Sequence, residues 1–215
     1  MYELSEKLWF PNPLNTHEDG LLAIGGDLSE ARLLLAYNSG IFPWFEDNQP
    51  ILWWSPDPRM VLFPENFKVS KSLRKTICSE KFQVTFNQNF EQVLYNCATV
   101  ARKGQTGTWI TREMQKAYLD LHKSEYAMSI EVWQLNRLVG GLYGIYLPEK
   151  KIFCGESMFS FVSDSSKVAF YYLCEYAISK DCHLIDCQIY NPHLESLGAQ
   201  EIDRKEFLQY LNPIF

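Results

Sequence analysis

Several features that define large functional classes are missing from this chain. It has no run of about 18 apolar residues, so no segment is expected to cross a membrane. Residues 1–7, MYELSEK, lack the apolar centre of a secretory signal peptide. None of the six cysteines forms a Cys-x-x-Cys pair, and we therefore expect no zinc or other metal site. The Gly25–Gly26 pair has neither the lysine nor the glycine spacing of a phosphate-binding loop.

Positive charge is also scarce. The net charge is −6 and the pI is about 5.3, which argues against a protein that coats nucleic acid through bulk charge. The most basic stretch, residues 70–75, holds Lys71, Arg74 and Lys75 at the start of a predicted helix. A charge run of this kind is usually a solvated face, but it is the first place to look for phosphate contacts.

Aromatic residues, in contrast, are abundant at 15% of the chain. Trp beside Pro forms rigid, ring-lined surface, and Trp44 follows Pro43 directly. We assign Trp44 to a binding surface, and Trp53 and Trp54 to a small aromatic core. The cysteines have apolar neighbours, which is typical of buried free thiols, so we expect a cytoplasmic protein.

The pattern of elements predicts an α+β (mixed α/β) fold. Strands are expected at residues 127–135, 137–147 and 151–159, followed by a buried helix at 166–179 and a strand at 184–188. A short strand near 200–202 and a helix at 205–211 end the chain. This order resembles an acyltransferase domain of the GNAT type, which we place at residues 65–215 after a small N-terminal α/β domain at residues 1–64.

Residues 183–191, HLIDCQIYN, predict a strand interrupted by one carboxylate. A charge in an apolar strand costs several kcal/mol unless it is paired or hydrogen-bonded. Because side chains alternate along a strand, Asp186 and Gln188 are expected on one face and Ile185 on the other. Two interpretations stay open, a functional site at Asp186 or a structural carboxylate that pairs with an arginine.

The two strands before the buried helix offer neighbours for that carboxylate. Gly140, Leu142 and Gly144 share one face of their strand, which predicts a groove. The alternative is a helix packed closely over the glycines. Glu156 and Met158 share a face of the next strand, so a carboxylate and apolar side chains are expected to line the same cavity.

Ordered stretches along nearly the whole chain resemble one known family. They lie at residues 20–29 (GLLAIGGDLS), 36–45 (AYNSGIFPWF), 50–59 (PILWWSPDPR), 108–111 (TWIT), 129–133 (SIEVW), 138–144 (LVGGLYG), 153–160 (FCGESMFS), 184–188 (LIDCQ) and 196–199 (SLGA). By these motifs the chain resembles the leucyl/phenylalanyl-tRNA–protein transferases.

The resemblance implies an aminoacyltransferase of the N-degron pathway. Such an enzyme moves leucine or phenylalanine, with methionine as a further candidate, from aminoacyl-tRNA to the α-amine of proteins with N-terminal Arg or Lys. The transfer marks the acceptor protein for degradation. The resemblance further implies a cytoplasmic bacterial enzyme that uses no cofactor and no acyl-CoA. We expect a monomer.

The resemblance also implies roles for individual residues. The family's catalytic pair falls on Asp186 and Gln188, where Gln188 holds the amine or the carbonyl while Asp186 polarises the amine. Trp44 and Trp109 match positions that stack on the 3′-terminal adenosine. Glu156 is assigned to reading either the nucleotide or the basic acceptor. The remaining substrate-binding positions are Leu142, Ser157, Met158, Leu173, Ala177 and Ile185.

Two other functions remain as alternatives. An acyl-CoA-dependent N-acetyltransferase needs a glycine-rich loop at a helix start to hold pyrophosphate, and residues 162–167, VSDSSK, contain no glycine. A non-catalytic peptide-binding module lined by aromatic residues would leave Asp186 and Gln188 dispensable. Transfer from Leu-tRNA to a peptide, with acetyl-CoA as a control, distinguishes the three.

Overall fold

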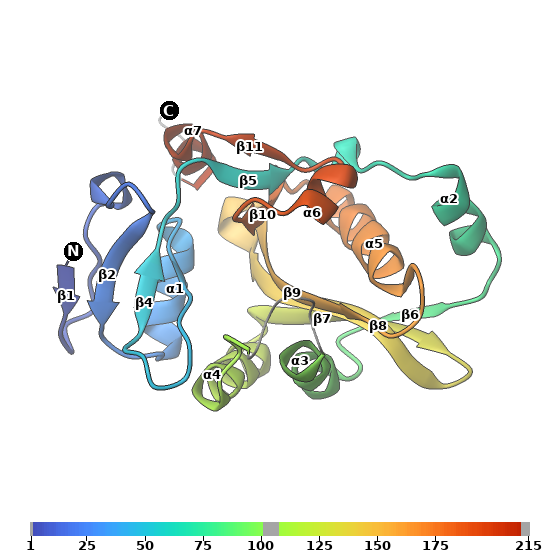
Figure 1. Cartoon of the computed structure of the whole chain (residues 1–215), viewed down its shortest axis with the longest axis horizontal. Coiled ribbons are helices and arrows are strands. Elements are labelled where there is room, and N and C mark those ends of the chain that lie inside the picture. The colour runs from blue at the N-terminus through green and yellow to red at the C-terminus, as the bar shows by residue number, and fades with distance from the viewer. Residues whose placement is uncertain (1, 101–107, 212–215) are drawn as a thin grey trace.

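The N-terminal part of the chain forms a small sheet with one helix against it (Figure 1). The computed structural model describes residues 2–100 and 108–211. The strand order is β1 (Tyr2–Leu4), β2 (Leu21–Gly25), β4 (Leu52–Trp54) and β3 (Phe42–Pro43), and α1 (Glu30–Asn38) packs beside β3. Helix α1 begins after Ser29 because the Ser29 side chain accepts a hydrogen bond from the backbone amide of Arg32.

A larger, seven-stranded sheet forms the centre of the molecule. Its order is β11 (Gln200–Ile202), β5 (Arg59–Leu62), β10 (Leu184–Gln188), β9 (Ile152–Ser160), β8 (Arg137–Leu147), β7 (Ala127–Gln134) and β6 (Gln83–Phe86). The predicted meander of three strands is β7, β8 and β9, and the predicted α+β class is confirmed.

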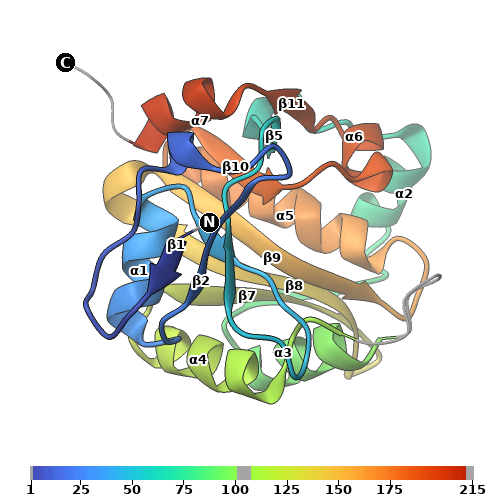
Figure 2. The ribbon, with the colours of Figure 1, turned by 60° about the vertical axis from the view of Figure 1, so that its left-hand side comes forward.

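Helices cover both faces of this sheet (Figures 1 and 2). On one face lies α5 (Ser165–Ser179), with α2 (Lys71–Cys78) packed on its outer side. The other face carries α3 (Phe90–Thr99) and α4 (Arg112–Lys123), and α1 contacts α4. The short α6 (Pro192–Ser196) follows β10, and α7 (Arg204–Leu211) follows β11. The buried apolar residues accordingly form two clusters.

The division into domains at residue 64 stays a prediction. Strand β5, which the prediction places with the N-terminal domain, pairs with β10 and β11 of the seven-stranded sheet. The N-terminal sheet and the central sheet are therefore joined directly by the chain between β4 and β5.

The predicted groove over the glycines of β8 is wrong. A side chain at Gly140 would collide with Ser165 at the start of α5, and one at Gly144 with the Phe153 ring and the Cys154 backbone. The glycines permit close packing, which is the alternative interpretation. The cavity that Leu142, Glu156 and Met158 line lies instead where β9 and β10 separate.

Strands β9 and β10 run parallel and are connected by α5. Their register is paired from Leu184 opposite Ile152 to Asp186 opposite Cys154, and no pair follows beyond that point in the described strands. Strand β9 nevertheless continues to Ser160. An opening between the ends of two parallel strands is a common place for a ligand in mixed sheets.

Candidate active site

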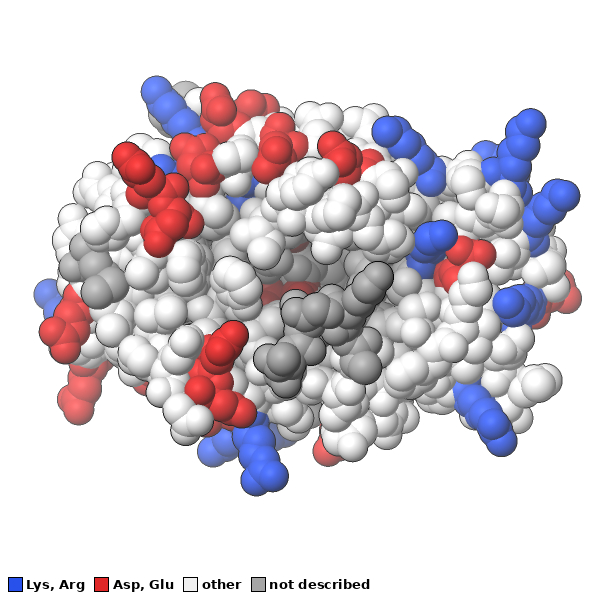
Figure 3. All heavy atoms as spheres, in the orientation of Figure 1, with Lys and Arg blue, Asp and Glu red and all other residues white. Residues whose placement is uncertain are grey.

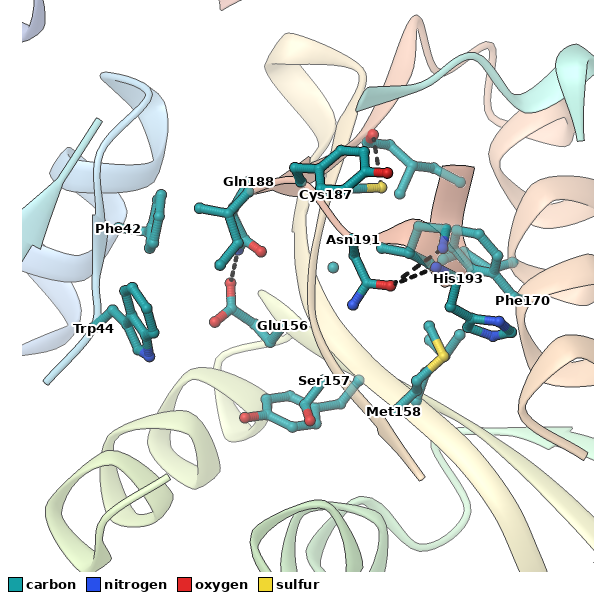
Figure 4. Close-up of a pocket in the computed structure, with 18 of the residues that line it drawn as sticks. Phe42, Trp44, Glu156, Ser157, Met158, Phe170, Cys187, Gln188, Asn191 and His193 are labelled. Atoms are coloured by element: carbon teal, nitrogen blue, oxygen red, sulfur yellow. Dashed lines mark hydrogen bonds between the residues drawn. The ribbon is translucent and has the colours of Figure 1, made fainter. Parts of the chain in front are cut away.

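A cavity of about 300 Å³ opens where β9 and β10 separate, beyond the last paired residues of the two strands (Figure 4). It is lined by Phe42, Pro43, Trp44, Trp109, Leu142, Tyr143, Gly155, Glu156, Ser157, Met158, Phe170, Leu173, Ile185, Cys187, Gln188, Ile189, Tyr190, Asn191, His193 and Leu194. Its volume is at the lower end of the range for small-molecule sites.

Two β-bulges on neighbouring strands build the polar centre of the cavity, which we define as Glu156 and Gln188. In the pairing of β8 with β9, Tyr143 lies opposite Ser157 and Gly144 opposite Gly155, so Glu156 is the extra residue. In the pairing of β10 with β5, the register shifts between Asp186 and Gln188, and Gln188 has a positive φ of 63°. Bulges re-aim side chains, and here the Gln188 amide nitrogen donates to Oε1 of Glu156 at 2.9 Å.

A chain of tyrosines supports the carboxylate from the other side. The hydroxyl of Tyr118 on α4 donates to Oε2 of Glu156 at 2.6 Å. The hydroxyl of Tyr37 on α1 lies 2.7 Å from the hydroxyl of Tyr118. Burial raises the pKa of Glu156 to about 7, a rise that these hydrogen bonds oppose and that the charge of Asp186 reinforces. Glu156 is therefore poised to exchange a proton near neutral pH.

Asp186 has a different environment, although it is only two residues from Gln188. Its two carboxylate oxygens accept hydrogen bonds from Nε and Nη2 of Arg59 at 2.8 and 2.7 Å. Both side chains are 1% exposed. Of the two interpretations left open by the sequence, pairing with an arginine is the one observed, and Asp186 does not line the cavity while Gln188 does.

The cavity is lined by residues of β10 that the alternation of side chains places on opposite faces of the strand. Ile185 and Cys187 belong to the hydrophobic cluster beneath α5, whereas Asp186 points to Arg59. Ile185, Cys187 and Gln188 all line the cavity. The cavity thus wraps around the end of β10, so that residues from both faces of this strand reach it.

One side of the cavity is aromatic. Phe42 and Trp44, which we call the aromatic wall, come from the N-terminal sheet and face the polar centre (Figure 4). Trp44 is 39% exposed, its ring lies 5.7 Å from that of Trp54, and its carbonyl accepts from the Trp54 indole at 2.7 Å. Trp53, in contrast, is fully buried, as predicted. Trp109, just before α4, also lines the cavity.

The opposite side is apolar, and we call it the apolar wall. It consists of Leu142, Met158, Phe170, Leu173 and Ile185. His193 lies next to Met158 and Phe170 at this end (Figure 4). Burial and the charge of Lys167 lower the pKa of His193, which favours its neutral imidazole form.

The structure separates the residues predicted from the sequence into three groups. Those that line the cavity are Trp44, Trp109, Leu142, Glu156, Ser157, Met158, Leu173, Ile185 and Gln188. Asp186 and Ala177 are buried and do not line it. Lys71, Arg74 and Lys75 lie on α2, on the outer side of α5.

Sequence reasoning missed several residues of the site. Phe170 could not be recognised because α5 is apolar nearly all round, so no change from apolar to polar residues distinguishes the side that faces the cavity. Asn191 and His193 follow β10 directly, and the Asn191 side chain accepts hydrogen bonds from the backbone amides of His193 and Leu194 at the start of α6. The Asn–Pro pair at 191–192 signals this helix start but not its position at the cavity.

Charge is unevenly distributed over the face shown in Figure 3. Lys and Arg side chains gather over the end that carries α2, and Asp and Glu side chains gather over β11 and α7. Acidic atoms are also visible at the bottom of the central hollow. A chain of net charge −6 therefore still presents one basic end.

Clusters of metal-ligating side chains and long apolar helices are both absent from residues 2–100 and 108–211. These residues contain no group of three or more His, Cys, Asp or Glu side chains that could hold a metal ion. Across the same ranges no helix has the length and apolar character needed to cross a bilayer.

Solved structures with partial similarity include the C-terminal domain of a putative lysylphosphatidylglycerol synthetase from Agrobacterium fabrum. It has a TM-score of 0.42 at 8% identity, over 89% of this chain and 64% of that one. A GCN5-related N-acetyltransferase from Kribbella flavida has a TM-score of 0.39 at 8% identity, over 83% of this chain and 63% of that one.

Sequence comparisons give much stronger similarity. The family model described as leucyl/phenylalanyl-tRNA protein transferase matches residues 61–212, and the model of that family's N-terminal domain matches residues 26–57. A leucyl/phenylalanyl-tRNA–protein transferase of Christiangramia forsetii is 57% identical over 98% of this chain and 100% of its own length. That of Flavobacterium johnsoniae is 56% identical over 98% and 99%. This chain therefore belongs to the leucyl/phenylalanyl-tRNA–protein transferase family.

Proposed function

We propose that the protein transfers leucine or phenylalanine, with methionine as a further candidate, from aminoacyl-tRNA to the α-amine of proteins with N-terminal Arg or Lys. Membership of the transferase family supports this proposal. The observation that carries it is the position of the Glu156–Gln188 pair between an aromatic and an apolar wall. The transfer would mark the acceptor protein for degradation through the N-degron pathway.

The reaction is an aminolysis of an ester, and its protons must be accounted for. The acceptor nitrogen attacks the ester carbonyl carbon, a C–N bond forms and the C–O bond to the ribose breaks. Of the two protons that the α-ammonium loses, one ends on the ribose oxygen and the other in solvent. A group that takes a proton at neutral pH and can return it to the ribose oxygen serves both steps.

Glu156 is the carboxylate suited to that role. It lines the cavity, and its pKa is raised to about 7, mainly by burial. Gln188 donates to Oε1 of Glu156 and thereby leaves its own amide oxygen to accept an N–H of the incoming amine. Because the ester is already activated, holding the amine in line with the carbonyl contributes as much as the proton transfer. The negative charge of Glu156 also suits a basic acceptor.

Asp186 is given an indirect role. Its two oxygens are engaged by Arg59, and Oδ1 also accepts from the backbone amide of Gln188 at 3.0 Å. We propose that Asp186 orients Gln188 through this backbone contact and does not itself take the proton. The family's catalytic pair would then act as one unit, in which Gln188 touches the substrate.

The walls of the cavity suit the two ends of an aminoacyl-adenosine. The apolar wall accepts a leucine or phenylalanine side chain, rejects polar ones strongly and distinguishes methylene groups by only about 1–3 kcal/mol. Ser157 lies in the lining beside Glu156 and Met158. Trp44 and Trp109 would stack on the terminal adenine. Lys71, Arg74 and Lys75 on α2 would contact the tRNA backbone.

The remaining parts of the proposal concern the protein as a whole. We propose that it works in the cytoplasm as a monomer, without a cofactor. We further propose that residues 1–64 form a small domain that supplies the aromatic wall, and that residues 65–215 form the GNAT-like catalytic domain.

A transfer assay tests the proposed function. Purified protein is incubated with radiolabelled Leu-tRNA and either a peptide with N-terminal Arg or the same peptide with its α-amine blocked. We expect label in the first peptide only. Parallel reactions with labelled acetyl-CoA test the acetyltransferase alternative. Label from acetyl-CoA, or none from Leu-tRNA at any salt concentration, would refute the proposal.

A further inference from the structure

Arg59 is a buried arginine whose contacts reach well beyond its own strand. Besides the paired hydrogen bonds to Asp186, its Nη1 donates to the carbonyl oxygen of Gly40 at 3.2 Å. Its guanidinium carbon lies 4.9 Å from the centre of the Phe42 ring and 4.6 Å from that of Phe207. Arg59 therefore contacts the N-terminal sheet, strand β10 and helix α7 at once.

Two of these contacts lead to two different parts of the cavity, the polar centre and the aromatic wall. Through Asp186, Arg59 connects to the backbone amide of Gln188 and so to the polar centre. Through Gly40 and Phe42, it connects to the segment that ends in Trp44. Glu156 and Gln188 follow Trp44 by 112 and 144 residues in the sequence. Arg59 contacts the aromatic wall at Phe42 and reaches the polar centre through Asp186.

We propose that Arg59 is a positioning residue for the transfer reaction, which fixes the aromatic wall relative to the Glu156–Gln188 pair. This inference rests on the proposed function, because it assigns the aromatic wall to the ester's adenosine and the Glu156–Gln188 pair to the reacting amine. It adds that the distance between the aromatic wall and the Glu156–Gln188 pair depends on the Arg59 side chain, which does not touch the substrate.

Arginine is suited to this task in a way that lysine is not. Its planar fork makes two parallel hydrogen bonds to a carboxylate and a third to a carbonyl, while its flat faces stack on rings. A lysine at this position keeps the positive charge next to Asp186. It cannot keep the fork, the contact with Gly40 and the stacking between two rings together.

A merely stabilising role for Arg59 is the alternative, because a broken buried ion pair usually destabilises a protein. The chain offers a matched control in Arg32, which is also 1% exposed. Arg32 pairs with Asp27 and donates to the carbonyl oxygens of residues 5, 6 and 7. None of these partners lines the cavity.

The experiment compares Arg59→Lys with Arg32→Lys by Tm, and by kcat and KM for Leu-tRNA with an Arg-peptide acceptor. We expect both variants to lose thermal stability. For Arg59→Lys we expect kcat to fall about 10- to 100-fold, because a small displacement of the reacting groups slows the transfer by that much. We also expect a higher KM for Leu-tRNA, because the aromatic wall is displaced. For Arg32→Lys we expect kcat and KM close to those of the wild type.

A second variant covers the case in which Arg59→Lys does not fold. Phe207 stacks on the guanidinium but does not line the cavity, so a kinetic effect of Phe207→Leu would pass through Arg59. We expect a lower kcat and a higher KM for this variant too. Equal kinetic losses in the Arg59 and Arg32 variants, or unchanged kinetics in Phe207→Leu, would overturn the inference. Absence of transfer by the wild type would instead refute the proposed function.

Discussion

Replacing Glu156 by glutamine should abolish most transfer and yet stabilise the folded protein. The carboxylate is partly buried and its pKa lies near 7, compared with an ordinary value of 4.5, a difference of about 2.5. At 1.36 kcal/mol for each pKa unit, the ionised form costs the folded state at most about 3 kcal/mol. Because the carboxylate also faces the cavity, solvent reduces that cost, and we expect a gain between about 1 and 3 kcal/mol at pH 8.

The sign follows from proton linkage. A carboxyl group whose pKa is raised by folding contributes its full stability below the unfolded-state pKa, and this stability is lost as the pH rises through about 7. The stabilisation by Glu156→Gln should therefore be large at pH 8 and small at pH 5. The new amide can donate to Tyr118, because the Tyr118 hydroxyl can turn its own hydrogen towards Tyr37.

Urea unfolding of wild type and variant at pH 5 and pH 8 measures this difference. Glu131 provides the control, since it is fully buried and accepts hydrogen bonds from Thr85, Ser129 and two backbone amides. Glu131→Gln should destabilise the protein at both pH values, because the NH2 group of glutamine cannot accept hydrogen bonds from these donors. A Glu156→Gln variant with the same stability change at pH 5 and pH 8 would refute the reasoning.

Three further predictions follow from the walls, the basic helix and the glycines. Trp44→Ala should raise KM for aminoacyl-tRNA about 5- to 150-fold, the equivalent of one lost stacking contact; an unchanged KM in steady-state kinetics would exclude stacking on Trp44. Changing Lys71, Arg74 and Lys75 to alanine should reduce the slope of log affinity for tRNA against log salt by about 2 to 3, and an unchanged slope in filter-binding titrations would place the phosphate contacts elsewhere. Gly140→Ala should destabilise the protein by about 1–3 kcal/mol in urea unfolding, because the added methyl collides with Ser165 at the start of α5; full stability would contradict that close packing.

Local patterns were sufficient for much of the fold. Alternation and hairpin signals predicted the three strands that form β7, β8 and β9, and the interrupted apolar run predicted β10. Trp44 was correctly separated from the buried Trp53 by its position after a proline. Each of these signals comes from residues a few positions apart, so the sequence alone is sufficient to recognise it.

The site depends on contacts that no local pattern records. Arg59 pairs with Asp186 across 127 residues, and the sequence marks Asp186 only as a carboxylate that needs some partner. Glu156 and Gln188 meet because both strands bulge, and a bulge displaces the alternation on which the prediction of faces depends. The tyrosines that support Glu156 come from α1 and α4, where they look like ordinary core residues.

The glycines of β8 also show that a local pattern is not sufficient. Their placement on one face was correct, but the space beside a glycine can be filled by a neighbouring element or left open. Ser165 of α5 and Phe153 of β9 fill the space here. Only the packing of elements that are distant in sequence decides between these outcomes.

We claim that Glu156 takes a proton from the amine during leucine transfer. The pH dependence of the single-turnover rate for wild type and Glu156→Gln, with saturating Arg-peptide, tests this claim directly. For wild type we expect the rate to rise with pH and level off above about 7, near the pKa of Glu156. For the variant we expect a rate lower by about 10²- to 10⁴-fold, with only the titration of the acceptor amine left. A variant with the wild-type profile and a similar rate would contradict the claim.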